Sequence, residues 1–302
     1  MGSADVVRTS AEATDLTALR DAYRKMQALS STDNRGWLYW ADLHGFPSFD
    51  CWHHFREGPG NTTFTYNLFL PWHRAYLLSW EHVVRDQNDA AIPPFWDWTS
   101  AASHEVGVPE AFTLEQVNGE PNPLANGPTP EMPGLPAHRT RRFPGDPAEL
   151  PTTDDLTNLI KNTSTFEDFT NQIEDIHDAI HGWVGGIDPT DPSRGGDMGV
   201  VATSAFDPLF WAHHCMIDRV WYLWQLEHGV NNIPPSYRHR PLAPFSLTST
   251  TSWTFTTSDT TTPSPPPAPR ARPRRTEQPR DSLRRHHHSS GHIGPRRRLP
   301  AS

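Results

Sequence analysis

The sequence predicts a mainly α-helical protein, a bundle of helices joined by long irregular loops and followed by a tail of low complexity. Two observations favour this fold class. Apolar residues recur at intervals of three and four in several segments, which is the spacing of one helix face. The signal for β-strands is weak throughout the chain. The 302 residues suffice for one large domain or two small ones.

Five segments carry the helical pattern, and residues suited to helix ends flank them. The segments are 15–30, 36–44, 70–85, 166–183 and 207–227. Asp15 and Asp207 can cap the first and the last of them, and Pro71 and Pro208 each fit a first helical turn. Residues 101–163 are rich in Pro, Gly, Asn and Thr, so we expect a long loop region there with only short elements.

The composition changes at about residue 248. Residues 249–264 are almost all Thr and Ser, and Pro and Arg dominate after them. Such a composition buries too little apolar surface to fold, so we expect one folded domain over residues 1–248 and a disordered tail over residues 249–302. The run TSTTSWTFTTSD is also what GC-rich codons would give when read out of frame. Resequencing of the coding DNA distinguishes these two interpretations.

Charge and targeting signals narrow the class of protein. The net charge is −9, but ten arginines against two carboxylates give residues 263–302 a charge of +8 and leave −17 for the rest. An acidic body argues against nucleic acid as the main partner. The start of the chain has no basic and apolar leader, and no apolar run approaches the ~18 residues of a membrane span. We therefore expect no membrane partner and, by default, a cytoplasmic location, with export alongside a partner left open.

Histidines are the most informative residues, and there are 17 of them. IHDAIHGW places His177 and His181 four residues apart, so both imidazoles lie on one helix face and can hold one metal ion. This pattern alone also occurs by chance. In DPLFWAHHCMID, His213 and His214 point about 100° apart on a helix. One of them can therefore be a ligand, while the other supports the site or packs.

A second group of histidines lies upstream. His44 ends the apolar stretch WLYWADLHG, His73 lies in LPWHRAYLL, and CWHH between them contains His53 and His54. Any one of these alone could be a hydrogen-bonded core histidine. Two sets of three, each bracketed by aromatic residues, instead favour two metal sites of three imidazoles each.

The donor set favours copper. Neutral imidazoles without carboxylates suit late transition metals, and Cu(II) binds most tightly in the divalent series. Zinc also accepts three imidazoles, but a paired hydrolytic zinc site would more often include bridging carboxylates, and none lies at ligand spacing here. We therefore predict two copper ions, with room for O2 between them.

Four segments of this chain resemble the type 3 copper family of tyrosinases, catechol oxidases and molluscan haemocyanins. FLPWHRAYLLSWE (69–81) looks like the first copper motif of the family and DPLFWAHHCMID (207–218) like the second. FWDWTS (95–100) and GDMG (196–199) are similar to further family signatures. The resemblance covers roughly residues 15–245. It implies a four-helix bundle core that holds a dicopper centre, and it makes residues 1–248 a copper-binding catalytic domain.

The resemblance also implies the ligands residue by residue. His44 and His73 would bind copper A. Copper B would be bound by His177, His181 and His214. The second copper A ligand departs from the family pattern, because Phe64 stands nine residues before the PWHR histidine, where the family usually has His. We prefer His53, with His54 as the alternative. Cys51 precedes His53 at the Cys-x-His spacing that in some members carries a thioether, and a buried free thiol is its alternative state.

Further roles follow from the same resemblance. Arg74, Asp207 and Asp218 would be buried charges that orient ligands or pair with each other. Glu174 fits a glutamate that, in related tyrosinases, holds a water near the first copper B histidine. Asp178 stands where those tyrosinases have an asparagine. A carboxylate there could hold the water or act as a base.

The implied function is oxidation of o-diphenols to o-quinones with O2 as co-substrate. Monophenol hydroxylation also requires removal of a proton, and the change from asparagine to Asp178 leaves it open. His213 would support the site, and Val201 would lie above copper A and limit substrate size or simply pack. An oxygen carrier of the haemocyanin kind and a binuclear zinc hydrolase are the competing interpretations. The expected partners are a small phenol and a copper-delivery helper protein, which some bacterial relatives use.

Overall fold

The computed structural model describes residues 8–44, 54–56 and 64–254. Its α-helices are α1 (Thr17–Gln27), α2 (Trp37–Ala41), α3 (Phe69–Gln87), α4 (Ala101–Val106), α5 (Thr153–Asn162), α6 (Phe166–Gly185), α7 (Val201–Ser204), α8 (Pro208–His228) and α9 (Ser249–Thr254). Short 3-10 turns are η1 (Glu110–Phe112), η2 (Pro147–Glu149), η3 (Asp197–Gly199) and η4 (Pro235–Tyr237). Two antiparallel strand pairs join β1 (His54–Arg56) to β2 (Phe64–Asn67) and β3 (Gln116–Val117) to β4 (Glu120–Pro121). The predicted mainly α-helical class is confirmed.

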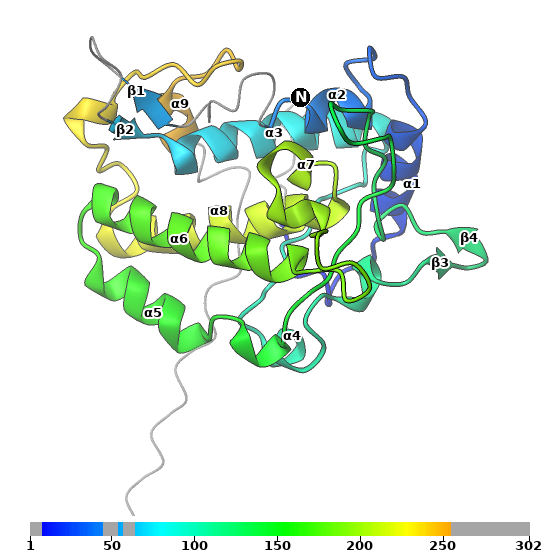
Figure 1. Cartoon of the computed structure of the whole chain (residues 1–302). Helices are drawn as coiled ribbons and strands as arrows, with labels where there is room; N and C mark the ends of the chain where they lie inside the picture. Colours follow the sequence, from blue (N-terminus) through cyan, green and yellow to red (C-terminus); the bar gives the residue numbers. More distant parts are fainter. Residues whose placement is uncertain (1–7, 45–53, 57–63, 255–302) are drawn as a thin grey trace, which may run out of the picture. The chain divides into compact units, whose positions relative to one another are not determined.

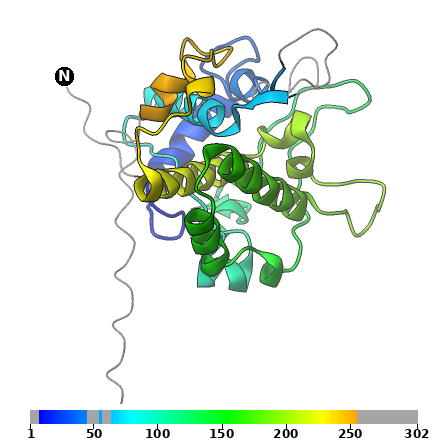
Figure 2. The same ribbon diagram turned by 90° about the vertical axis from the view of Figure 1, so that its left-hand side faces the viewer.

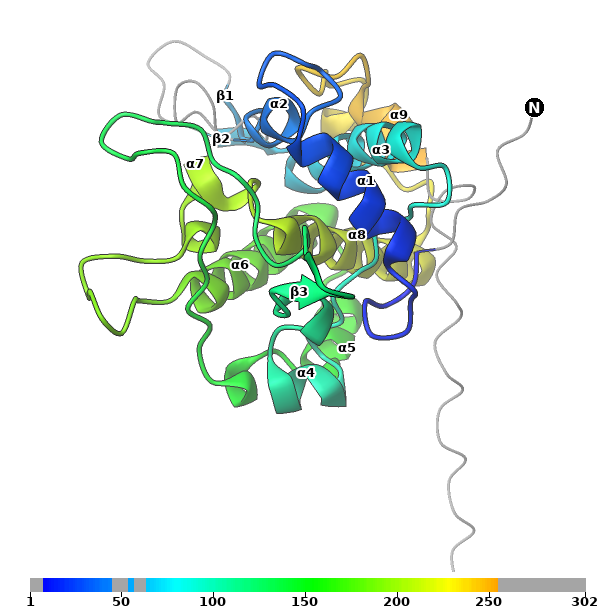
Figure 3. The same ribbon diagram turned by 90° about the vertical axis from the view of Figure 1, so that its right-hand side faces the viewer.

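The long helices α3, α6 and α8 form the centre of the fold (Figure 1). Helix α3 packs against α8 on one side and against α1 and α9 on others, while α5 contacts both α6 and α8. Figure 2 shows the orange α9 beside the cyan α3, and Figure 3 shows the blue α1 crossing next to α3. Helix α6 also contacts α3, so the three helices that carry most of the histidines meet in one core.

Helices α3 and α8 are buried on almost every side. In α3, 13 of 19 residues are buried, including Trp72, Tyr76 and Trp80. A helix that is apolar all round belongs inside a core rather than on a surface. Helix α8 begins as predicted: the Asp207 carboxylate accepts a hydrogen bond from the Leu209 N–H at 2.8 Å, and a proline occupies the first turn.

Large aromatic side chains hold α1, α2, α3 and α8 together. The indoles of Trp80 and Trp211 stack with centroids 3.6 Å apart and an interplanar angle of 5°. Tyr23 and Trp37 meet Trp80 edge to face at 5.8 Å and 5.1 Å. Contacts of this kind combine a large buried apolar area with favourable ring geometry. This packing fixes the helices that carry the histidines.

One helix was missed within the region that the sequence predicts as loops. Helix α5 has a capping box, in which the Thr152 hydroxyl accepts from the Asp155 N–H and the Asp155 carboxylate accepts from the Thr152 N–H. Its apolar side chains Leu156 and Leu159 are buried. The capping signal was present in TTDD, but the composition of the surrounding segment outweighed it.

The predicted domain boundary also precedes the last packed element. Helix α9 lies within the segment expected to be disordered, yet the side chain of Trp253 is fully buried. The Ser252 hydroxyl donates to the Pro71 carbonyl at 2.6 Å, and the Gln225 amide donates to the Trp253 carbonyl at 3.3 Å. A single tryptophan and two well-placed serines give this Thr/Ser-rich segment enough packing to fold on α3. The rest of the predicted tail lies outside the described residues.

Among the described residues, no helix is both long and apolar enough to cross a membrane.

Candidate metal centre

Four elements bring six histidines into one cluster. Helix α6 carries His177 and His181 one turn apart, and α8 carries the adjacent pair His213 and His214. Helix α3 carries His73, and His44 follows the end of α2. The exposed fraction is 9% for His44, 7% for His177 and 3% or less for His73, His213 and His214. The packing of these helices therefore removes most of the cluster from solvent.

The imidazoles of α6 and α8 converge through their Nε2 atoms. The Nε2 atoms of His177 and His214 are 3.2 Å apart, and those of His181 and His214 are 3.4 Å apart. These are the three residues that the sequence assigns to copper B. Separations of this size suit three ligands around one ion whose bonds to nitrogen are about 2 Å long.

The second predicted set lies on the other side of His214. The possible ligand atoms of His44, His73 and His214 all lie within 4.8 Å of one another. The rings of His73 and His214 stack with centroids 4.3 Å apart. His53 and Cys51 lie outside the described residues, and for His54 the structure describes only the backbone of β1. The second ligand of copper A and the thioether therefore stay predictions.

Backbone carbonyls determine which ring nitrogen faces the centre. Nδ1 of His44, His73 and His181 lies 3.2, 2.9 and 2.7 Å from the carbonyl oxygens of Val201, Phe69 and Met198, respectively. A carbonyl oxygen only accepts hydrogen bonds, so in the neutral ring each Nδ1 carries the proton. Each Nε2 is then the unprotonated ring nitrogen, which is the arrangement that supporting contacts usually impose on metal-bound histidines.

Burial keeps these imidazoles neutral. It lowers the pKa of His44 and of His181 to about 4, in His44 with a further contribution from the neighbouring His181. The pKa values of His177, His213 and His214 are held well below the usual range by burial and by the adjacent histidines. Near neutral pH these five imidazoles are therefore uncharged and offer nitrogen lone pairs. This donor set fits cations of the late transition metals.

His213 has no polar contact in the cluster. Both of its ring nitrogens are buried without a hydrogen-bond partner. Its ring is nearly parallel to that of His177, with an interplanar angle of 16° and centroids 5.2 Å apart, and lies 5.0 Å from the ring of His181. His213 therefore packs against the two histidines of α6. Its possible ligand atom also lies within 4.8 Å of those of His177 and His181.

Two carboxylates lie one turn apart on α6 beside the cluster. Glu174 accepts a hydrogen bond from the Asn67 amide at 2.5 Å. Asp178 accepts from Nδ1 of His177 at 2.9 Å, and its side chain is 73% exposed. Asp178 thus fixes the ring of one predicted copper B ligand and reaches solvent at the same time.

Arg74 and Asp218, two of the predicted buried charges, pair with each other as expected, and Asp218 has a second partner that was not predicted. Arg74 and Asp218 form a buried ion pair at 2.5 Å that joins α3 to α8. Asp218 also binds Arg8 at 3.0 Å, and Arg8 in turn binds Glu81 at 2.8 Å. No spacing in the sequence pointed to Arg8 or Glu81, because their partners are distant along the chain.

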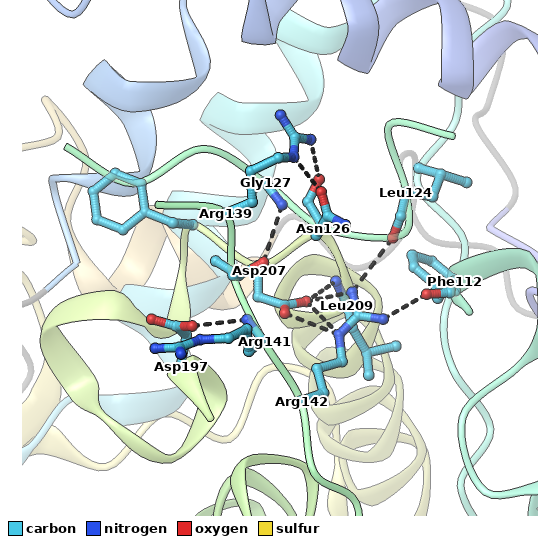
Figure 4. A network of polar contacts seen from close by, with 12 residues as sticks. Phe112, Leu124, Asn126, Gly127, Arg139, Arg141, Arg142, Asp197, Asp207 and Leu209 are labelled. Carbon is cyan, nitrogen blue, oxygen red and sulfur yellow. Dashed lines mark hydrogen bonds and ion pairs between the residues drawn. The ribbon is translucent and has the colours of Figure 1, made fainter. Parts of the chain in front are cut away.

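Asp207 pairs with Arg142, a residue that the sequence analysis missed. The Arg142 guanidinium donates to both carboxylate oxygens of Asp207, and the shorter of these contacts is 2.6 Å. It also donates to the carbonyls of Phe112 and Leu124 (Figure 4). Asp207 is fully buried. This fork connects the first turn of α8 to the loop before η2, so it supports the helix that carries His214.

Val201 touches the site through its backbone. Its side chain is 61% exposed, while its carbonyl oxygen holds Nδ1 of His44. Its predicted role in limiting substrate size stays a prediction.

Comparisons of the sequence and of the structure with known proteins identify the same family. A sequence model for the common central domain of tyrosinase matches residues 21–227. A G-type haemocyanin of Enteroctopus dofleini is 29% identical over 246 residues, which cover 77% of this chain and 8% of that protein. A tyrosinase of Streptomyces lincolnensis is 29% identical over 183 residues, which cover 53% of this chain and 63% of that protein. The chain thus spans only part of the length of these relatives.

Solved structures show the same fold. Tyrosinase from Burkholderia thailandensis superimposes with a TM-score of 0.62 at 20% identity, covering 82% of this chain and 71% of that one. A functional unit of octopus haemocyanin gives 0.60 at 24% identity, covering 82% and 65%. Together with the match over residues 21–227 and the two groups of converging imidazoles, they show that this chain belongs to the tyrosinase family of type 3 copper proteins.

Proposed function

We propose that this protein oxidises o-diphenols to o-quinones with O2 as the electron acceptor. The observation that carries the proposal is the pair of carboxylates, Glu174 and Asp178, one turn apart on α6 beside the imidazoles. An oxygen carrier needs only the metal ligands. A phenol oxidase must also take up the protons that its substrate loses, and carboxylates next to the metal site supply that function.

The chain's own residues hold and orient the reacting groups. When bound, the two copper ions supply the redox chemistry that couples oxidation of the phenol to reduction of O2. The Nε2 atoms of His177, His181 and His214 would hold one ion, and those of His44 and His73 would hold the other together with the predicted His53. The backbone carbonyls on Nδ1 keep these rings oriented during turnover.

Proton transfer is assigned to the two carboxylates. Each o-diphenol loses two electrons and two protons, so two diphenols and one O2 give two quinones and two waters. Asp178 is exposed, so it can exchange protons with solvent after accepting one from a phenolic hydroxyl. Glu174 accepts a hydrogen bond from the Asn67 amide, and its position four residues before Asp178 puts it on the same face of α6. Hydroxylation of monophenols would use the same acceptors.

An oxygen carrier is the second candidate function. Haemocyanins are among the relatives of this chain, and their 29% identity equals that of the Streptomyces tyrosinase. The same imidazoles would serve a carrier. A zinc hydrolase has less support, because both groups of candidate ligands in the described part of the chain contain histidine alone.

Oxygen consumption by the copper-loaded protein tests the proposal, with 4-methylcatechol and p-cresol supplied separately. Uptake with the catechol alone identifies a catechol oxidase, and uptake with both identifies a tyrosinase. If protein verified to hold two copper ions consumes no oxygen with either phenol, the proposal is wrong and the carrier function is favoured.

Variants of α6 test the role of the carboxylates. We expect Asp178→Asn and Glu174→Gln to lower kcat by about 10²-fold or more, in the range of general base catalysis. Asp175→Asn is the matched control, because Asp175 is an exposed carboxylate on the same helix. Copper content is measured in each variant. An unchanged kcat in both carboxylate variants at full copper content would remove the reason for preferring an enzyme.

A further inference from the structure

Aromatic rings connect one predicted copper ligand with the surface of the protein. The imidazole of His44 lies nearly parallel to the phenol ring of Tyr76, with an interplanar angle of 8° and centroids 6.3 Å apart. Tyr76 stacks in turn on Trp40, at an angle of 24° and a distance of 6.5 Å. Trp40 meets the ring of Tyr39 edge to face at 6.1 Å. We call this succession of rings, from His44 through Tyr76 and Trp40 to Tyr39, the aromatic series.

The aromatic series leads from the core to solvent. Tyr76 is 1% exposed, Trp40 is partly buried, and Tyr39 is 39% exposed. Tyr39 and Trp40 belong to α2, whereas Tyr76 lies on α3, so the packing of these two helices assembles the series. An electron that enters at Tyr39 would reach the imidazole of His44 in three ring-to-ring steps.

The residue types in the series suit the transfer of single electrons. Tyrosine and tryptophan lose one electron more readily than phenylalanine does. Phe210 lies closer to His44, at 4.8 Å, but its ring is a poor electron donor. Tyr76 is therefore the neighbour of His44 that can pass an electron on.

Hydrogen bonds within the series do not remove protons permanently. The Tyr76 hydroxyl donates to the Trp40 carbonyl, and the Trp40 indole donates to the Asn34 carbonyl at 2.7 Å. A carbonyl oxygen accepts a hydrogen bond but is too weak a base to keep the proton. Each ring that has lost an electron is therefore restored when the next ring supplies one.

A second group of aromatic rings branches from Tyr76 but stays in the core. Trp211 lies 4.9 Å from Tyr76 and stacks on Trp80. Both indoles are fully buried. A donor in solvent cannot approach this pair, whereas it can approach Tyr39. The exposed end of the aromatic series is thus where electrons from outside would enter.

We propose that the aromatic series carries single electrons from a donor at the surface to the copper centre, so that this protein also oxidises one-electron donors that do not bind at the metal ions. The oxidant is hydrogen peroxide, and the copper ions supply the redox chemistry when they are bound. One H2O2 takes up two electrons and two protons from solvent, its O–O bond breaks, and two waters form. The inference rests on the copper centre and not on the oxidation of phenols, so it applies to an enzyme and to an oxygen carrier alike.

Peroxide-driven oxidation of a water-soluble ferrocene with a quaternary ammonium group tests the proposal in the copper-loaded full chain. Two ferrocenes, one H2O2 and two protons give two ferrocenium ions and two waters, and this donor contains no phenol. We expect Trp40→Phe to lower the rate by about tenfold or more, because phenylalanine keeps an aromatic ring in place but resists oxidation. Trp40→Tyr restores an oxidisable ring and should retain most of the rate.

Trp224→Phe is the matched control for these variants. The Trp224 indole also donates to a backbone carbonyl at 2.7 Å, but it lies outside the aromatic series. Its replacement should leave ferrocene oxidation unchanged. Copper content is measured in every variant, so a loss of metal is not mistaken for a loss of electron transfer.

Mass spectrometry gives a readout that does not depend on turnover. When peroxide is added without a donor, the rings of the series must supply the electrons themselves. We therefore expect oxygen addition at Trp40 and Tyr39 in the copper-loaded protein and not in the metal-free protein. The ferrocene should suppress this modification, because it replaces the lost electrons.

Three results would overturn the proposal. The first is the absence of ferrocene oxidation by wild-type protein that holds two copper ions, and the second is an equal rate in Trp40→Phe. The third is a loss of rate in Trp183→Phe alone, since Trp96 lies 6.4 Å from His213 and 6.1 Å from Trp183 and would then provide the route. If Trp40→Phe fails to fold, Tyr39→Phe is measured instead, and the same loss of rate is expected.

Discussion

Replacing Asp218 by Asn should strongly destabilise the protein, because one buried carboxylate serves two guanidiniums. Asp218 is 5% exposed and lies 2.5 Å from Arg74 and 3.0 Å from Arg8. Asparagine keeps the size of the side chain and removes its charge. Arg8 retains Glu81, but Arg74 retains only uncharged partners, namely the Gln225 amide oxygen at 3.0 Å, the backbone carbonyl of residue 218 at 3.4 Å and the face of Trp221.

The expected loss follows from the cation that remains. Leaving one buried charge without its partner costs about 3 to 5 kcal/mol. With a urea dependence of about 3 kcal/mol per molar, the unfolding midpoint should fall by about 1 to 1.7 M. Because Arg74 follows His73 and Asp218 lies one turn after His214, the same change should also loosen the two helices that hold the metal.

Urea unfolding of the wild type, Asp218→Asn, Arg74→Met and the double variant Arg74→Met/Asp218→Asn measures the effect. The double variant should be less destabilised than the sum of its single changes, since it no longer buries a lone cation. Asp33→Asn, which alters an exposed pair with Arg35, is the control and should leave the midpoint unchanged. A loss below about 1 kcal/mol for Asp218→Asn would refute the reasoning, because it would mean that the guanidiniums are hydrated in the folded protein.

Three further predictions concern stability. His44 and His181 have a pKa of about 4 in the fold and about 6.5 when unfolded, so the unfolded chain binds more protons between these values. The free energy of unfolding of the metal-free protein should therefore fall by up to about 3 kcal/mol per histidine as the pH falls from 6.5 to 4. A urea midpoint that stays constant across this window would contradict the burial of the two imidazoles. Thr152→Ala should lower the free energy of unfolding by about 1 kcal/mol through loss of the α5 cap, with Thr153→Ala as the control, and equal effects of the two would exclude capping as the cause. Trp253→Ala should lower it by about 3 to 5 kcal/mol in chemical denaturation, whereas no change would mean that α9 does not pack on the core in solution.

The metal centre was predictable because its pattern is local. The four-residue spacing of His177 and His181 follows from helix geometry alone, and the structure places both beside His214. The ambiguity between His213 and His214 was also visible in the sequence, since adjacent helical residues point in different directions. In the structure Nε2 of His214 lies beside those of the α6 pair, and a possible ligand atom of His213 also lies within 4.8 Å of theirs, so the choice between the two stays a prediction.

Features that depend on distant contacts could not be predicted. Arg8 meets Asp218 across 210 residues, and no local spacing encodes such a pair. Arg142 lies in a Pro- and Gly-rich loop, so its fork on Asp207 had no signal in the sequence. Helix α9 shows the opposite limit: composition predicted disorder, but the buried Trp253 and two buried serines pack this helix on the core. Composition averages over residues, while packing depends on individual ones.

The segment of residues 197–204, which comprises η3 and α7, determines how freely the surface beside the metal centre can change. It orients His44 and His181 through main-chain carbonyls, which every residue type possesses. Substitution of the exposed Val201 side chain therefore leaves the acceptor for His44 in place. The surface next to the metal centre can accumulate changes, by natural drift or by laboratory selection, without a compensating change in the ligands. The exposed side chains of this segment and the orientation of the two imidazoles can therefore change independently.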